Sequence, residues 1–84
     1  MKFYLSTYET GTDFFDVPYI QARYSIHNNP GFLDICLNVE IGKSPIEIIL
    51  NGLCKLYKTD EITMFYKNMM YKTCNGYYQE YKRY

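Results

Sequence analysis

Few side chains in this sequence of 84 residues could take part in catalysis. His27 is the only histidine, and therefore the only side chain whose ordinary pKa lies close to neutrality. Strand alternation would place it on one face with Ser25 and Cys36, so a Ser–His or Cys–His pair can be drawn. Such a pair also needs an orienting group, an oxyanion site and a concave pocket, which a flat sheet surface does not supply. We therefore expect a surface histidine and no enzymatic activity.

The second group with potential chemistry is a loop rich in acids. Its carboxylates, from Glu9, Asp13 and Asp16, could bind Mg²⁺ or Ca²⁺, or could imitate phosphates to a basic partner. Their spacing is not that of an EF-hand and supplies fewer ligands than a Mg²⁺ site usually has. Phe14 and Phe15 lie among these acids, and neighbouring residues rarely both point into a core. An exposed aromatic ring with a charged rim predicts a protein-docking loop.

The C-terminal sequence CNGYYQEYKRY combines aromatic rings with cations. Rings beside cations hold the bases in many single-strand nucleic-acid binders, but Lys82 and Arg83 supply only two charges and no known nucleic-acid motif is present. Helical spacing favours packing of the tyrosines first, protein docking second and nucleic-acid binding third. Tyr81 is expected to face inwards. The candidate partner-binding residues of this segment are Tyr77, Tyr78, Lys82 and Arg83.

Cysteine usage and the N-terminus indicate a compartment. Cys36, Cys54 and Cys74 are widely spaced, form no CxxC pair and have one histidine to assist them, so no zinc site is indicated. Unpaired thiols are typical of a reducing environment, and the N-terminal residues do not resemble a signal peptide. No apolar run approaches the ~20 residues that span a bilayer. We expect a cytoplasmic protein with no cofactor and no membrane contact.

The strongest structural signal is an alternating pattern around the sequence NNPG. Apolar residues occupy every second position over 19–27 and over 32–41, which predicts an antiparallel hairpin with one buried face. Pro30 and Gly31 favour a four-residue loop, and a two-residue loop is the alternative that keeps the same face buried. The preceding sequence KFYLSTY predicts another strand, with Phe3, Leu5 and Thr7 inwards, followed by a loop of about eleven residues.

Beyond residue 43 the apolar spacing becomes helical. Ser44, Pro45 and Glu47 form a capping box with the favoured first-turn proline, which predicts a helix over residues 44–58. Gly52 inside this helix predicts the close approach of another element.

A second helix is predicted from Thr59, and a short third one after a stop at Asn75-Gly76. The apolar stripe of the second helix would contain Ile62, Phe65, Tyr66, Met69 and Met70 or Thr73. The expected fold is one α+β domain over residues 1–84. In it, a three-stranded antiparallel sheet, with its central hairpin at about 19–27 and 32–41, is followed by two to three helices packed on one face.

Composition gives the functional expectation. The abundance of Phe, Tyr, Ile, Asn and Lys, with Ala22 as the only alanine, indicates an AT-rich genome such as that of a phage, plasmid or virus. In size and type the chain is similar to small phage-encoded inhibitors of host enzymes or defence systems, anti-CRISPR proteins among them, and equally to immunity proteins. We expect a non-enzymatic module that inhibits a host or defence protein by occluding its surface. A nucleic-acid-binding regulator is the alternative, although a net charge of zero excludes binding by the whole surface, and homodimerisation stays open.

Overall fold

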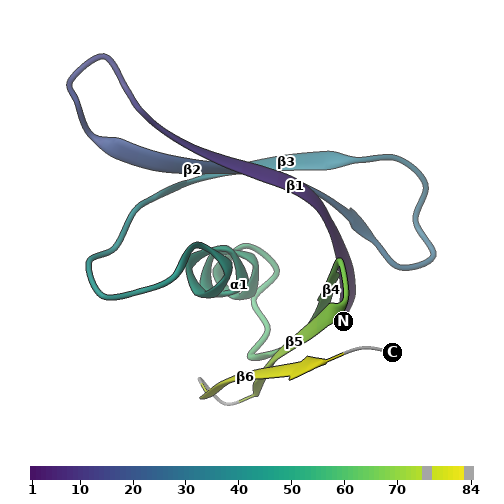
Figure 1. Ribbon diagram of the computed structural model, residues 1–84. Coiled ribbons are helices and arrows are strands. Elements are labelled where there is room, and N and C mark those ends of the chain that lie inside the picture. Colours follow the sequence, from purple (N-terminus) through teal and green to yellow (C-terminus); the bar gives the residue numbers. More distant parts are fainter. Residues whose placement is uncertain (75–76, 83–84) are drawn as a thin grey trace.

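The computed structural model describes residues 1–74 and 77–82, which form one six-stranded mixed sheet and one helix (Figure 1). The elements are β1 (Lys2–Thr12), β2 (Pro18–Ile26), β3 (Leu33–Asn38), α1 (Pro45–Leu56), β4 (Glu61–Tyr66), β5 (Met69–Cys74) and β6 (Tyr77–Lys82). The strand order is β3-β2-β1-β4-β5-β6, and every neighbouring pair is antiparallel except β1 with β4. The expected fold class is therefore wrong, because six strands replace three and the described residues contain one helix rather than two or three.

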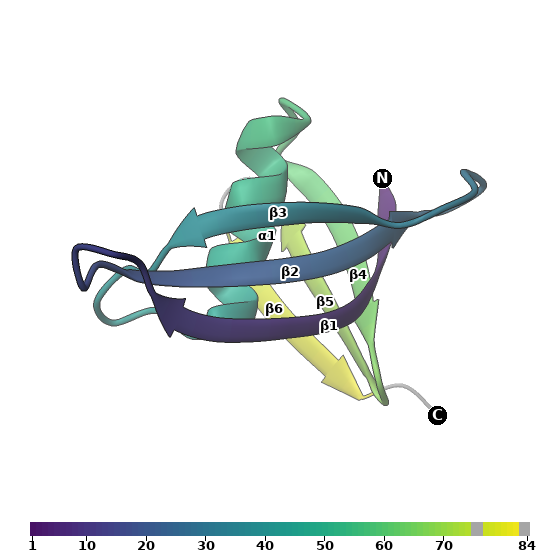
Figure 2. The same cartoon turned by 90° about the horizontal axis from the view of Figure 1, so that it is seen from above.

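The sheet is strongly bent around the helix. Strand β1 curves from the layer of β2 and β3 into that of β4, β5 and β6, and α1 lies on the concave side between these two halves (Figures 1 and 2). The convex side of the sheet carries no helix from the described residues. The core fills the concave side, and its least exposed large side chains are Phe3, Ile20, Tyr24, Ile49, Leu50, Leu53, Ile62 and Met64.

The helix begins as the sequence predicts. Ser44 adopts an extended conformation, and its hydroxyl accepts a hydrogen bond from the Glu47 backbone N–H at 3.3 Å. Pro45 occupies the first turn, where a missing N–H costs nothing. The buried face of the helix includes Ile48, whereas Leu56 in the last turn is 55% exposed.

The close approach predicted at Gly52 is confirmed. A Cβ atom on Gly52 would lie 2.5 Å from Cδ2 of Leu37, which shows that β3 packs directly against the helix backbone. Gly52→Ala alone gains about 1 kcal/mol of helix propensity but forces Leu37 to move. We expect the same substitution to be at least about 1 kcal/mol more favourable in a Leu37→Ala background. Urea unfolding of both single variants and the double variant measures this coupling, and additive values would contradict it.

The first three strands keep the predicted alternation but change its details. The β2–β3 hairpin pairs Tyr24 with Leu33 and Tyr19 with Asn38, so its loop is longer than either predicted one and β3 ends at Asn38 rather than near residue 41. In β1 the register shifts between Leu5 and Thr7. This bulge turns Thr7 to the convex side, contrary to the expected inward position.

The predicted second helix is wrong, because its residues form the β4–β5 hairpin. Tyr66 pairs with Met69 across the two-residue turn Lys67-Asn68, in which Lys67 has a φ of +54°. Apolar residues stand on both faces of this hairpin, since Phe65 and Met70 pair on the convex side. Apolar side chains on both faces produce the i, i+3, i+4 spacing that resembles a helical stripe.

The predicted third helix is also wrong, because the last described segment is the edge strand β6. Alternation places Tyr78 on the concave face, where it stacks on Tyr71 with ring centroids 6.2 Å apart. Tyr81 points to the convex face and is 41% exposed, contrary to the expected inward orientation. The predicted stop at Asn75-Gly76 lies outside the described residues.

Candidate functional site: the tip of the β1–β2 hairpin

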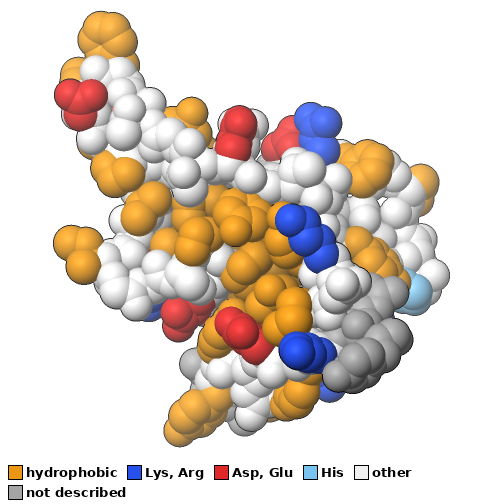
Figure 3. Space-filling view, in the orientation of Figure 1, with side chains coloured by type: hydrophobic (Ala, Val, Ile, Leu, Met, Phe, Trp, Pro, Cys, Tyr) orange, Lys and Arg blue, Asp and Glu red, His pale blue; other side chains and the backbone are white. Residues whose placement is uncertain are grey.

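The β1–β2 hairpin projects beyond the rest of the sheet (Figure 1). Its last pair joins Thr12 to Pro18, so the loop between the strands consists of five residues, Asp13 to Val17. The predicted loop of about eleven residues is therefore mostly strand. Hydrophobic and acidic side chains gather at this tip in the space-filling view (Figure 3).

Hydrogen bonds to Asp13 fix the shape of the tip. One carboxylate oxygen, Oδ1, accepts from the backbone N–H of Phe15 at 2.8 Å and from that of Val17 at 2.9 Å. The Asp13 backbone N–H donates to the Val17 carbonyl at 3.0 Å, and its carbonyl accepts from Asp16 at 3.1 Å. Asp16 adopts a left-handed φ of +61°, which aspartate tolerates better than most residues do. The loop is thus pre-organised by its own backbone and one carboxylate.

This geometry exposes both phenylalanines. Phe14 is 95% exposed and Phe15 is 81% exposed, so neither contributes to the core. Their rings contact each other edge to face, with centroids 5.6 Å apart. The sequence predicted one exposed ring among acids, and the structure presents two. Asp13, which the sequence placed in the charged rim, instead caps the loop, and the signal for that role is an aspartate at the first position after the strand.

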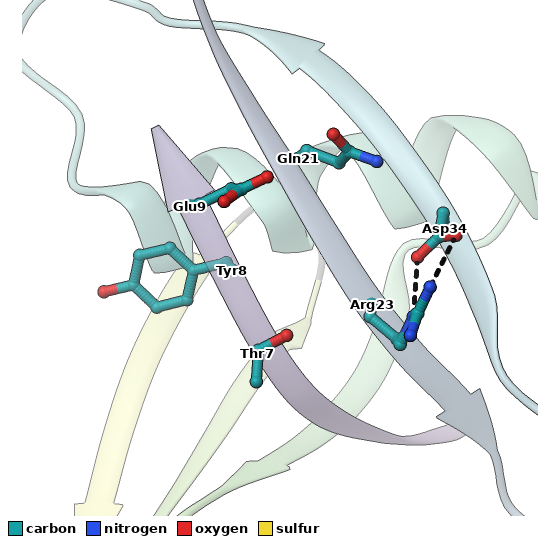
Figure 4. A pocket seen from close by; sticks show the side chains of 6 residues that line it. All are labelled: Thr7, Tyr8, Glu9, Gln21, Arg23 and Asp34. Carbon is teal, nitrogen blue, oxygen red and sulfur yellow. Dashed lines mark hydrogen bonds and ion pairs between the residues drawn. The ribbon is translucent and has the colours of Figure 1, made fainter. Parts of the chain in front are cut away.

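The convex face behind the tip holds a shallow polar hollow of about 210 Å³ (Figure 4). Arg23 crosses it to Asp34, with Nε and Oδ1 3.1 Å apart, and this hydrogen bond and charge raise the pKa of the guanidinium. Glu9 lines the hollow from β1 and forms no ion pair with any described residue. The lining offers hydroxyl, amide and carboxylate groups together with the Arg23–Asp34 ion pair. Its lining residues are Thr7, Tyr8, Glu9, Gln21, Arg23 and Asp34.

His27 lies away from both features. Its Nδ1 is 2.8 Å from the hydroxyl of Tyr4, and the pair is exposed on the convex side of the sheet. No group of three His, Cys, Asp or Glu side chains within residues 1–74 and 77–82 is arranged to hold a metal ion. The three cysteines are free, and burial raises the pKa of the Cys54 thiol.

The predicted binding residues do not form one surface. Glu9, Asp13, Phe14, Phe15 and Asp16 belong to the β1–β2 hairpin. The C-terminal candidates lie on β6, at the far edge of the sheet, and are split between its two faces. Tyr77 is exposed on the convex face, whereas Tyr78 and Lys82 share the other face, and Arg83 lies outside the described residues.

Tyr78 is held by packing as well as by a hydrogen bond. Its hydroxyl donates to Oε1 of Glu80 at 2.6 Å. Burial and this carboxylate raise the pKa of the Tyr78 hydroxyl. Packing and this hydrogen bond thus hold the Tyr78 ring on the concave face of β6.

Comparison with protein-family models, with curated proteins and with solved structures finds no match to this chain. Neither the fold nor these comparisons support the expected phage-encoded or anti-CRISPR-like inhibitor. Within the part of the chain that the structure describes, no helix has the length and apolar character needed to cross a membrane.

Proposed function

We propose that the protein is a non-enzymatic protein-binding module whose β1–β2 hairpin tip inserts into an apolar pocket of a partner protein. The observation that carries this proposal is the exposure of two adjacent aromatic rings, Phe14 and Phe15, on a loop that hydrogen bonds hold in one shape. Exposed aromatic side chains near the centre of an interface commonly supply most of the binding energy.

Pre-organisation of the tip favours specific binding to one partner over non-specific hydrophobic association. Because Asp13 already orders the loop, little conformational entropy is lost when the tip enters a pocket. A disordered loop with the same two rings would have to lose that entropy on binding. The hairpin tip is therefore expected to bind in the conformation that it already has, with little entropic cost.

Charge defines the rim of the partner pocket. Residues 3–22 contain Glu9, Asp13 and Asp16 but no lysine or arginine. A pocket lined by apolar side chains and surrounded by lysine or arginine would complement this tip. Asp16 and Glu9 would contribute to orientation and association rate more than to affinity, since both lie at the exposed edge of the contact.

The test compares three baits in a pull-down from the lysate of the source cell. Wild type and Phe32→Ser should recover the same partner at stoichiometric yield, whereas Phe14→Ser/Phe15→Ser should lose it. Truncating a hot-spot ring costs at least about 2 kcal/mol, so affinity should fall at least about 30-fold. Phe32 is the matched control, because it is 66% exposed and lies in the connection between β2 and β3.

Loss of the partner by a variant can be distinguished from unfolding of that variant. All three phenylalanines are exposed, so we expect the thermal midpoint of each variant to match that of wild type. Recovery of the same partner by the double variant would contradict the proposed role of the tip. Recovery of no stoichiometric partner by wild type, over a range of salt concentrations, would contradict the proposed function.

A further inference from the structure

A second surface, which the proposed function does not use, lies on the convex face of β1, β4, β5 and β6. The pairing registers align the side chains of this face in rows across the four strands. One row is apolar and largely aromatic: Tyr4, Phe65, Met70 and Tyr81. The neighbouring row is polar and basic: Lys2, Thr63, Lys72 and Gln79.

The polar row opens into a hollow of about 310 Å³. Thr63, Lys72 and Gln79 line it and offer a hydroxyl, an ammonium group and an amide. Along β6, alternation puts Tyr77 and Tyr81 on the same face as Gln79, one on each side of it. The two rings are 75% and 41% exposed, so hydrogen-bonding groups lie between two accessible aromatic surfaces.

The ring of Tyr81 is held beside a cation. Lys72 Nζ lies 5.8 Å from the centroid of this ring, within the range of a cation–π contact. The Tyr81 hydroxyl donates to Oε1 of Gln79 at 2.5 Å, which fixes the ring orientation. On β1 and β4, the rings of Tyr4 and Phe65 stack with centroids 5.5 Å apart and continue the apolar row.

We propose that this face binds single-stranded nucleic acid, with bases stacked on Tyr81 and Tyr77 and phosphates at Lys72 and Lys2. Aromatic platforms beside cations bind single strands with little sequence preference, because every base has a π-face. Tyr77 and Tyr81 lie about 13 Å apart along the strand, so each would stack on a different base.

The charge of the face supports a short and weak phosphate track. Among the described residues of the polar row and of the row beside it, Lys2 and Lys72 stand near the carboxylate of Glu61, which accepts a contact from Sγ of Cys74 at 3.8 Å. Glu61 lies in the row that pairs with Tyr77, so phosphates are favoured at the opposite side of the hollow. Glu61→Gln should therefore strengthen binding.

The experiment uses fluorescence anisotropy of labelled oligo(dT) and oligo(U) of about 12 nucleotides, within the range of known site sizes. With two phosphate contacts, the logarithm of the association constant should fall with a slope of about −1.4 against the logarithm of salt. Raising salt from about 50 to about 200 mM should therefore weaken binding about sevenfold. The two oligomers separate a DNA ligand from an RNA ligand.

Paired variants locate the surface. Lys72→Gln should halve the salt slope, and Tyr81→Leu should weaken binding about tenfold with the slope unchanged. Lys82→Gln is the matched control, because Lys82 pairs with Met69 and so belongs to the concave face of the same edge of the sheet. It should bind as wild type does. If Tyr81→Leu fails to fold by circular dichroism, Tyr77→Leu tests the same platform.

The proposal would be overturned by no anisotropy change with either oligomer, by binding without salt dependence, or by equal weakening in Lys82→Gln and Lys72→Gln. Capture of a protein by this face, lost in Tyr81→Leu, together with no oligomer binding, would also overturn it. The Phe14→Ser/Phe15→Ser variant should bind oligomers as wild type does. Failure of the tip and failure of this face are therefore distinguishable.

Discussion

Replacing Phe3 by alanine is expected to lower the free energy of unfolding by about 3–5 kcal/mol. Phe3 is fully buried in β1, at the bend of the sheet, and its ring centroid lies 5.2 Å from that of Tyr57 and 5.7 Å from that of Tyr24. Its Cα partners are Ile26 on one side and Met64 on the other, so the cavity would open between the two halves of the sheet. Domains of this size are stable by only about 5–15 kcal/mol, so the loss is a large fraction of the total.

Phe15→Ala is the matched control for this prediction. The same two residue types are exchanged, but Phe15 is 81% exposed and its loss should change stability by no more than about 0.5 kcal/mol. Urea unfolding followed by circular dichroism measures both variants. Equal effects at the two positions would show that the core is not centred on Phe3.

Stability should fall steeply at alkaline pH. Tyr24 is 2% exposed, and its hydroxyl lies 2.7 Å from that of Tyr57. Burial, first, and the hydrogen bond to Tyr57, second, raise the pKa of Tyr24 above its ordinary value near 10. A raised pKa means that the folded state keeps the proton after the unfolded state has lost it. This contribution is therefore complete below pH ~10 and disappears as pH rises towards the folded-state pKa.

The expected slope is a loss of about 1.4 kcal/mol per pH unit above pH ~10 for each such tyrosine. Tyr78, whose pKa is raised by burial and by Glu80, should add to it. Urea unfolding at several pH values from neutrality to about pH 11.5 measures the slope. Tyr24→Phe should lose about 1 kcal/mol at neutral pH, with the hydrogen bond, and should then fall less steeply. An identical alkaline slope in Tyr24→Phe would exclude Tyr24 as a source.

Local signals in the sequence predicted the parts of the fold that depend on local chemistry. The cap at Ser44 and the first-turn proline at Pro45 determine where the helix begins, whatever it packs against. The buried faces of β2 and β3 follow from strict alternation, which survives a change in loop length because only the parity of the register matters. At Gly52 a residue unfavourable to a helix revealed the approach of β3.

The remaining elements depend on partners far away in the chain. Phe65 and Met70 are apolar residues on the convex face of β4 and β5. Because of them, the sequence of these strands does not alternate between apolar and polar residues. The turn at Lys67 carries no glycine or proline, and its left-handed φ is imposed by the pairing around it. Strand β6 forms only because β5 offers an edge to it, and its tyrosines fit a helix equally well in isolation.

The candidate site was predicted in part. The exposed ring among acids was visible in the sequence, because Phe14 and Phe15 are adjacent and the flanking residues are polar. Both rings are exposed because the hydrogen bonds accepted by Asp13 fix the shape of the loop. These hydrogen bonds depend on the pairing of Thr12 with Pro18, which closes the loop. The convex rows around Lys72 depend on four strands in register and could not be read from any one of them.

The parallel pairing of β1 with β4 has a consequence for the chain entropy of folding. Only three residue pairs join these strands, from Lys2↔Thr63 to Tyr4↔Phe65, and they connect positions about sixty residues apart. Closing a loop of that length costs about 2 kcal/mol more than closing a five-residue hairpin, if both behave as flexible chains. Every other neighbouring pair in the described sheet is a local antiparallel connection. Within the sheet, the cost of long-range closure therefore falls on one short junction, in which the side chains of Phe3 and Met64 are both fully buried.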